Sequence, residues 1–374
     1  MNILFCYQNG FYPQNGGVQR YCYDLSNYLK SHGYTVFFLS LVHDEDFQKI
    51  VSENYYHLPE KLRLDTTQNK EFYFRLISEL KIDTIVNNEA TNKRFDFFNN
   101  TKNLRVNKLS IFHSNPVFNL KLNDKPNHLF SKIRFFLINY LKKNKRKKMI
   151  NNLVSKSDKV IFLSERYVSA LKVSLSISSK KITSISNFIE INSNLGYCKK
   201  ENTILFVGRL DEVKQLDVLL LAWGKIVDEF ENWTLNILGT GPNEKIYKNL
   251  VKTKLIKGVK FIGKTDPIPY YQKSKIICLP SKYEGFGLVL TEAMSFGVVP
   301  VAFNNWLSLQ DIIDDGVNGI IVNDKSIIGL TNSLRILMFN EDNLNKMSKN
   351  SFKKAKYFDI HKIGKDWLKL LNSL

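Results

Sequence analysis

The stretch PSKYEGFGLVLTEAMSFGVVPV, residues 280–301, carries two carboxylates eight positions apart, Glu284 and Glu292, with a Gly-Phe-Gly turn directly after the first. The apolar run KIICL precedes it and is typical of a buried strand. Residues 288–296 follow the turn and have the composition of a helix. A strand, a glycine turn and a helix start direct backbone N–H groups and the positive end of the helix dipole at one place. The stretch therefore predicts an anion site.

Because two carboxylates already lie in this stretch, its ligand must offer more than negative charge. A phosphate would suit the start of the helix, and hydroxyl groups would donate hydrogen bonds to the carboxylates. This combination favours a nucleotide sugar.

Short apolar runs alternate with helical patterns along the chain, which predicts an α/β protein with parallel sheets. In the first half the expected strands cover residues 2–7, 35–41, 84–87, 108–112 and 159–163. In the second half they cover residues 203–207, 233–238, 259–262, 275–279, 299–303 and 319–322. Two such series indicate two doubly wound domains facing a cleft, with ligands beyond the carboxyl ends of the strands.

The domain boundary is expected where apolar periodicity is lost, in the polar segment 190–202. A first Rossmann-like domain then covers residues 1–190 and a second covers residues 200–356. Near the end of the chain, apolar residues recur at helical spacing at Ile360, Ile363, Trp367, Leu370 and Leu371. Residues 357–374 are therefore expected to form a closing amphipathic helix.

Composition points to a globular protein, because 44% of the 374 residues are hydrophobic and 24% are charged. The length allows two sizeable cores. The four cysteines match no metal-binding spacing, so we expect reduced thiols in a cytoplasmic protein. We expect no signal peptide and no membrane span, since no run approaches ~20 apolar residues.

The net charge of +19 is concentrated in residues 101–200, which contain 21 Lys and Arg but only 4 Asp and Glu. The densest part is residues 132–148, KIRFFLINYLKKNKRKK, where apolar side chains lead into six basic residues within seven positions. The pattern favours a helix on an anionic membrane surface, where each Lys or Arg contributes about 1 kcal/mol. The alternative is a solvated helix face without a partner. Nucleic acid is not expected, because no recognition motif accompanies the charge.

Three short motifs follow expected strands of the second half. They are Gly208-Arg209 with Lys214, then Gly239-Thr240-Gly241-Pro242, then Glu284-Gly285-Phe286-Gly287. Arg209 and Lys214 could neutralise a diphosphate, and the glycines could let a ligand approach the backbone closely. Glu292 could accept hydrogen bonds from a ribose diol, and Glu284 from sugar hydroxyls.

The first half has a glycine turn of its own, Gly16-Gly17, which can place backbone N–H groups against a phosphate. His113 follows the expected strand 108–112 and should point at the cleft. The acid–x–acid pattern Asp44-Glu45-Asp46 is interpreted as a solvated polar loop. No metal site is predicted.

The blocks GGVQR, HSNP, FVGRLDEVK, LGTGP and residues 280–301 together resemble the retaining glycosyltransferases of family 4, which have the GT-B fold. SNFIEI, near Asn187, resembles the segment before the interdomain linker of that family. The resemblance covers nearly all of the second half and scattered blocks of the first, while residues 42–100 match nothing. One departure is Gln215, which follows Lys214 where the family usually has glycine.

The resemblance implies transfer of a hexose or N-acetylhexosamine from a nucleotide-diphosphate sugar, with UDP favoured over GDP. It implies retention of configuration by front-face attack, in which the leaving diphosphate takes the acceptor's proton, and no metal or cofactor. The first domain would bind the acceptor and the second the nucleotide sugar, with the last helix crossing back to the first.

The resemblance also implies individual roles. Glu284 would contact the donor sugar and Glu292 the ribose. Arg209 and Lys214 would bind the diphosphate, and His113 would lie beside the donor sugar at the reaction centre. Backbone amides for sugar and phosphate would come from Phe286, Gly287 and Leu288.

The basic segment 132–148 suggests a glycan or lipid-linked acceptor of bacterial surface polysaccharide synthesis, such as O-antigen or capsule. The protein would then be peripheral to the inner face of the cell membrane. Two alternatives stay open, a sugar-nucleotide epimerase of the same fold and a non-enzymatic basic membrane-binding protein.

Overall fold

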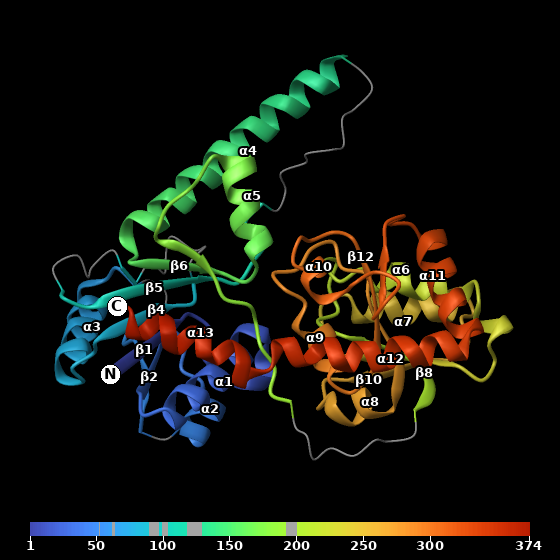
Figure 1. The fold of residues 1–374 in the computed structure, drawn as a ribbon, viewed down its shortest axis with the longest axis horizontal. Coiled ribbons are helices and arrows are strands. Elements are labelled where there is room, and N and C mark those ends of the chain that lie inside the picture. Colours follow the sequence, from blue (N-terminus) through green and yellow to red (C-terminus); the bar gives the residue numbers. More distant parts are fainter. Residues whose placement is uncertain (52, 62–63, 90–96, 99–103, 118–128, 192–199) are drawn as a thin grey trace. The chain divides into compact units, whose positions relative to one another are not determined.

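The structure, a computed structural model, describes residues 1–51, 53–61, 64–89, 97–98, 104–117, 129–191 and 200–374, and only the backbone of 129–136. The described chain divides into two compact units (Figure 1). Unit 1 comprises Met1–Asn187 and Ile360–Leu374, and unit 2 comprises Phe188–Asp359. The change of unit at Asn187 falls just ahead of the polar segment 190–202, of which residues 192–199 lie outside the described residues.

Unit 1 contains a seven-stranded parallel sheet in the order β3-β2-β1-β4-β5-β6-β7. Its strands are β1 (Asn2–Tyr7), β2 (Thr35–Ser40), β3 (Tyr55–His57), β4 (Thr84–Asn87), β5 (Asn107–Phe112), β6 (Lys159–Phe162) and β7 (Ile182–Ser184). The middle residues of β1 are fully buried, as continuous apolar runs in parallel sheets require. The five strands expected in this half are confirmed to within two residues at each end, whereas β3 and β7 were not predicted.

The helices of unit 1 are α1 (Gly17–Ser31), α2 (Glu45–Val51), α3 (Thr67–Glu79), α4 (Leu129–Lys156), α5 (Glu165–Leu175) and α13 (Ile360–Asn372). The predicted polar loop at Asp44-Glu45-Asp46 is wrong from Glu45 onward, because α2 begins there. Asp44 Oδ1 accepts the backbone N–H of Phe47 at 3.1 Å and so caps this helix.

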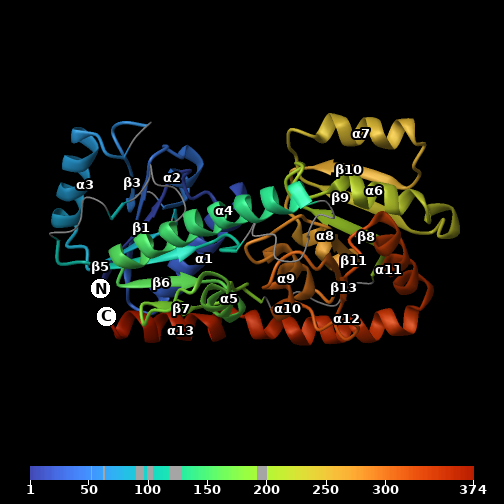
Figure 2. The ribbon, with the colours of Figure 1, turned by 90° about the horizontal axis from the view of Figure 1, so that it is seen from above.

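The closing helix α13 begins at Ile360, three residues later than predicted, after a short 3₁₀ turn at Lys356–Phe358. Its apolar face packs on α1 of unit 1, where Trp367 and Leu371 are buried. A Cβ atom at Gly364 would overlap the Tyr28 ring, so the two helices approach closely there. Both chain ends lie in unit 1, near each other (Figure 2).

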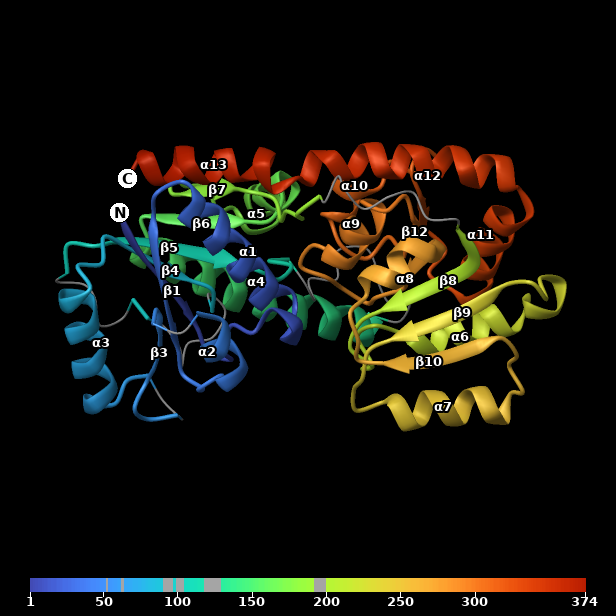
Figure 3. The same ribbon diagram turned by 90° about the horizontal axis from the view of Figure 1, so that it is seen from below.

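Unit 2 contains a six-stranded parallel sheet in the order β10-β9-β8-β11-β12-β13, and Figure 3 shows β8, β9 and β10 running in one direction. Its strands are β8 (Glu201–Val207), β9 (Thr234–Leu238), β10 (Val259–Gly263), β11 (Ser274–Leu279), β12 (Val299–Phe303) and β13 (Ile320–Val322). All six predicted strands of this half are confirmed to within two residues at each end.

The helices of unit 2 are α6 (Leu216–Gly224), α7 (Glu244–Thr253), α8 (Ile268–Lys273), α9 (Leu288–Met294), α10 (Leu309–Ile312), α11 (Ile327–Phe339) and α12 (Glu341–Ala355). Helices α6 and α11 contact each other and share one buried core with the sheet, which includes Trp223 and Leu334. Cys6, Cys22 and Cys278 are buried free thiols, and Cys198 lies outside the described residues. Within the described ranges, no helix is both long and apolar enough to span a membrane.

Candidate functional site

The order of the strands in unit 2 reverses between β8 and β11. In open parallel sheets, ligands bind beyond the carboxyl ends of the strands at such a reversal. Gly208-Arg209 directly follows β8, and the stretch from Pro280 directly follows β11. Two of the three motifs singled out in the sequence therefore flank the expected ligand position of this sheet.

A short ion pair links these two loops. Lys214 Nζ lies 2.6 Å from Glu284 Oε1, and the two side chains are only 19% and 14% exposed. Ser281 Oγ donates to the same carboxylate oxygen at 2.7 Å. The backbone N–H of Lys282 also donates to the carbonyl of Val213 at 2.8 Å. The structure thus brings together two predicted residues that lie 70 positions apart, and adds Ser281, which the sequence analysis missed.

Local backbone geometry positions Lys214. Asp211 Oδ1 accepts the backbone N–H groups of Val213 and Lys214 at 3.0 and 3.3 Å. Gln215 adopts a left-handed conformation with φ 48° before α6 begins. Glycine suits that conformation best, which gives a physical reason for the glycine that the family resemblance leads us to expect at this position. Gln215 adopts this conformation directly after Lys214 although it carries a side chain.

Arg209 is placed differently from Lys214. Its side chain is 72% exposed, and its Nε lies 3.6 Å from Asp211 Oδ2. No ion pair with Glu284 or Glu292 is recorded for Arg209 within the described parts of the chain. Its guanidinium is therefore a surface cation beside the loop and not part of the half-buried pair.

The glycines of the loop after β9 have a structural reason that the sequence analysis did not foresee. A Cβ atom at Gly239 would overlap the carbonyl oxygen of Gly208, and one at Gly241 would overlap that of Leu210. The backbone N–H of Leu210 donates to the carbonyl of Thr240 at 2.9 Å. These glycines let the loop after β9 pack directly on the loop after β8.

Two side chains hold the Gly-Phe-Gly turn in place through hydrogen bonds to its backbone carbonyl groups. The carbonyl of Phe286, whose side chain is buried, accepts from Trp306 Nε1 at 3.0 Å, and Ser308 Oγ donates to the carbonyl of Gly285 at 3.2 Å. Gly287 has φ 101° and caps α9, which starts at Leu288 as predicted but ends at Met294, two residues early.

Glu292 lies on α9, and its Oε2 accepts from the hydroxyl of Tyr271 at 2.9 Å. Tyr271 comes from α8, is buried, and stacks on Phe296 with ring centroids 6.0 Å apart. The sequence analysis missed Tyr271, since nothing in IPYYQK marks one tyrosine as a carboxylate partner. The two glutamates therefore have different partners, Lys214 for Glu284 and Tyr271 for Glu292.

In unit 1, His113 directly follows β5, and its Nε2 lies 2.9 Å from Asn88 Oδ1. Its ring meets the Tyr21 ring edge-on, with centroids 5.1 Å apart. Burial lowers the pKa of His113 to about 3, so the imidazole is neutral near pH 7. At the turn before α1, a Cβ atom at Gly17 would meet nothing within 4 Å, whereas one at Gly16 would meet the Gln19 side chain.

Residues 132–148 lie in α4, whose amino-terminal end extends away from the sheet of unit 1 in Figure 1. Leu137, Tyr140 and Leu141 are 58–62% exposed, and the lysines at 142, 143 and 145 that follow are exposed as well. The apolar and basic parts follow one another along the helix. The side chains of residues 132–136 lie outside the described part of the chain.

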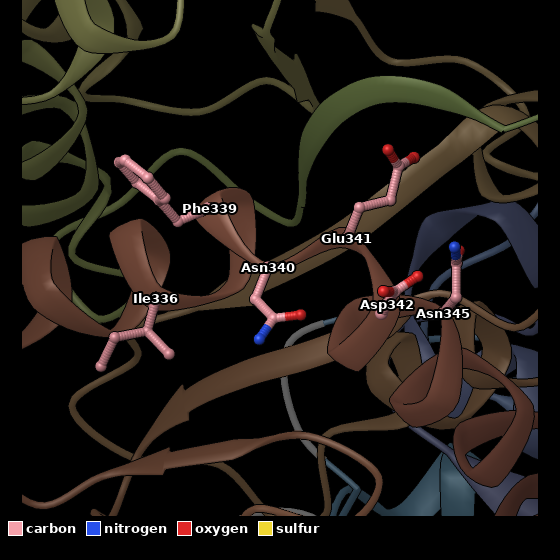
Figure 4. A pocket seen from close by; sticks show the side chains of 6 residues that line it. All are labelled: Ile336, Phe339, Asn340, Glu341, Asp342 and Asn345. Carbon is pink, nitrogen blue, oxygen red and sulfur yellow. The ribbon is translucent and has the colours of Figure 1, made fainter.

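A surface pocket of unit 2 lies elsewhere, at the junction of α11 and α12 (Figure 4). It is lined by Ile336, Phe339, Asn340, Glu341, Asp342 and Asn345, none of which is a predicted site residue. In the described ranges, no group of three or more His, Cys, Asp or Glu side chains could hold a metal ion.

Comparisons with known proteins find family models that match both halves of the chain. The family model described as Glycosyl transferases group 1 matches residues 188–354, and the model described as Glycosyltransferase Family 4 matches residues 15–193. The chain is 33% identical over 221 residues to a protein of Haemophilus influenzae named an uncharacterized glycosyltransferase, covering 58% of this chain and 62% of that protein.

A second relative is an N-acetylgalactosaminyltransferase of Campylobacter jejuni, named for a diNAcBac-PP-undecaprenol acceptor, with 30% identity over 222 residues. The match covers 59% of each chain, so the chain spans about three fifths of these two curated relatives. Among solved structures, a mutant of S. aureus TarM in complex with UDP, Fondaparinux and alpha-GlcNAc-glycerol aligns with a TM-score of 0.78 at 14% identity, over 99% of both chains. At that identity the likeness shows the fold.

Proposed function

Since the chain belongs to the family 4 glycosyltransferases and has the GT-B fold, we propose that it transfers a hexose or N-acetylhexosamine from a nucleotide-diphosphate sugar, with UDP favoured. The observation that carries the proposal is the half-buried Lys214–Glu284 pair beside the strand reversal of unit 2. A cation and a carboxylate held together there suit a ligand that has both phosphate and hydroxyl groups. The complex of the TarM structure with UDP supports the choice of base.

In the proposed reaction, Lys214 and the exposed Arg209 stabilise the negative charge that grows on the leaving diphosphate. Glu284 accepts hydrogen bonds from the donor sugar, and Glu292 accepts them from the ribose. The neutral imidazole of His113 offers a hydrogen bond to the sugar without adding charge. The transfer is proposed to retain configuration and to use no metal or cofactor, with the leaving diphosphate taking the proton of the acceptor hydroxyl.

The proposed acceptor is a glycan or lipid-linked sugar of bacterial surface polysaccharide synthesis. The name of the Campylobacter relative, which contains an undecaprenol diphosphate, supports an acceptor on a lipid. The exposed apolar and basic stretch of α4 supports a peripheral position on an anionic membrane surface. Nucleic acid is not proposed as a partner.

Substituting the two glutamates separately tests the proposal. We expect UDP to raise the melting temperature of the wild-type protein more than GDP does. Glu292→Ala should weaken UDP binding about 10- to 100-fold, because the carboxylate then no longer accepts from the ribose. Glu284→Ala should chiefly lower turnover of UDP-sugars. The exposed Glu231→Ala in the same unit is the matched control.

Equal loss of UDP affinity in both variants would contradict the assigned roles. The open alternatives give different results in the same assay. A sugar-nucleotide epimerase would convert the UDP-sugar without an acceptor, and a non-enzymatic binder would show no melting shift with either nucleotide.

Vesicle flotation tests the membrane part of the proposal. We expect the protein to float with vesicles rich in anionic lipid and not with neutral ones, and the triple change Lys142→Gln, Lys143→Gln, Lys145→Gln to abolish most of that difference. The control removes three exposed lysines of unit 2, Lys252, Lys254 and Lys260. Equal flotation with neutral vesicles, or equal loss in the control, would contradict a specific role for α4.

A further inference from the structure

The sheet of unit 1 has a strand reversal of its own, between β1 and β4. Tyr7 is the last residue of β1, and Glu89 follows β4 by two residues. The two strands are neighbours, with Cys6 paired to Asn87. A phenol and a carboxyl group therefore flank the place where a parallel sheet of this kind binds its ligand. None of the roles assigned so far uses either side chain.

Two buried amides fix the backbone that carries Glu89. Asn87, 1% exposed, accepts the backbone N–H of Glu89 on its Oδ1 at 2.9 Å. Asn88, 5% exposed, donates from Nδ2 to the carbonyl of Val86 at 3.3 Å, and its Oδ1 lies 2.9 Å from His113 Nε2. The backbone that carries Glu89 is thus linked through Asn88 to the side chain of His113.

Tyr7 interacts electrostatically with Glu89 and with Cys22. Burial raises the pKa of Glu89 to about 7, and burial together with the charge of Glu89 raises the pKa of Tyr7 to about 12. From α1, the Cys22 thiol has its pKa raised by burial, and from β5, His113 is uncharged. Among the described residues, no Lys or Arg is recorded as an ion-pair partner of Glu89. Near neutral pH, Glu89 therefore titrates beside a phenol that keeps its proton.

We propose that Glu89 binds a hydroxyl group of the sugar acceptor as a carboxylate, with the Tyr7 phenol as a neighbouring donor. A sugar hydroxyl can donate to a carboxylate and accept from a phenol at once, which matches this pair of groups. The inference rests on the proposed function and adds to it a residue that selects the acceptor. It concerns unit 1 alone and leaves the donor site of unit 2 as described.

The test compares Glu89→Gln with the exposed Glu79→Gln at the end of α3 as the matched control. Transfer is measured from UDP-GlcNAc, UDP-GalNAc, UDP-glucose and UDP-galactose to undecaprenyl-diphosphate-linked N-acetylhexosamine between pH 5.5 and 9. We expect wild-type kcat/KM for the acceptor to rise with pH through a midpoint near 7, as the carboxylate forms. Glu89→Gln should lose this rise and raise the acceptor KM about 10- to 100-fold, because a hydrogen bond to a charged group is lost.

Donor KM and UDP affinity should stay within about twofold in Glu89→Gln, and Glu79→Gln should behave as wild type. Folding gives an independent check. A carboxyl group whose pKa is raised in the folded state stabilises the fold below pH 4.5, and this contribution is lost as pH rises through about 7. Glu89→Gln should therefore melt no lower than wild type at pH 8, so a kinetic defect there is not a folding defect.

An unchanged acceptor KM and pH midpoint in Glu89→Gln would overturn the inference, and so would an equal loss of donor affinity. If the wild-type protein transfers sugar and Glu89→Gln has the same acceptor kinetics, this inference alone is overturned. No UDP binding and no transfer by the wild-type protein would overturn the proposed function and this inference together.

Discussion

Replacing Lys214 with methionine is expected to lower the turnover of UDP-sugars about 10²- to 10³-fold. The ammonium group is held half-buried beside the strand reversal of unit 2, where water screens it less than it screens the exposed Arg209. Removal of one preorganised hydrogen-bond donor that faces a developing negative charge has an effect of that size in other enzymes. Steady-state kinetics at saturating donor measure the loss, and Lys214→Arg should retain part of the rate because it retains the charge.

The same change should also destabilise unit 2. Methionine leaves the Glu284 carboxylate, 14% exposed, without its ion-pair partner. Removing one partner of a buried pair typically costs about 3–5 kcal/mol, and at this partial exposure we expect the lower end of that range. The melting temperature without nucleotide should therefore fall clearly, and so should the urea concentration at which half of the protein is unfolded.

A double variant separates the two effects. In Lys214→Met with Glu284→Gln, the uncompensated charge is gone and an amide can still accept from Ser281 Oγ. We expect most of the stability to return while turnover stays at least as low as in the single variant. If the double variant recovered both stability and turnover, or neither of them, the structural and catalytic roles of the pair would not be separable.

The pattern of apolar runs was sufficient to place both sheets, because a strand buried on both faces must be apolar throughout. It failed for β3 and β7, each three residues long, where YYH and ITS lack a buried apolar run. The pairing of Lys214 with Glu284 could not be predicted either. The two residues are 70 positions apart, and they meet only because β8 and β11 are neighbours in the sheet. Neither loop sequence indicates that order of strands.

Glu89 and Tyr271 illustrate the same limit for single residues. A glutamate two positions after a strand resembles any surface acid until the strand order shows that β4 lies beside β1. Tyr271 becomes recognisable only through its hydrogen bond to Glu292. Gly239 and Gly241 show the limit for backbone packing, because their close contact with the loop after β8 depends on the neighbouring strand. That they also let a ligand approach stays a prediction.

Gly239→Ala is the change with the largest expected effect on the fold. The new methyl group would overlap the carbonyl oxygen of Gly208, which is backbone and cannot turn aside. Gly239 also has φ 129°, a conformation that L-residues rarely adopt. Together the clash and the dihedral should cost about 3 kcal/mol or more in unfolding free energy. UDP binding should fall as well, because Gly208 begins the loop that carries Lys214.

Gly263→Ala separates the two contributions. Gly263 also has a positive φ, 87°, but a Cβ atom there would meet nothing within 4 Å, and its carbonyl accepts the N–H of Gly239. This control should lower the unfolding free energy by the dihedral contribution alone, about 1–2 kcal/mol. It should leave UDP affinity nearly unchanged. If urea denaturation gave equal losses for the two variants, the overlap with Gly208 would contribute nothing. The close packing of the loops after β8 and β9 would then not be what positions Lys214.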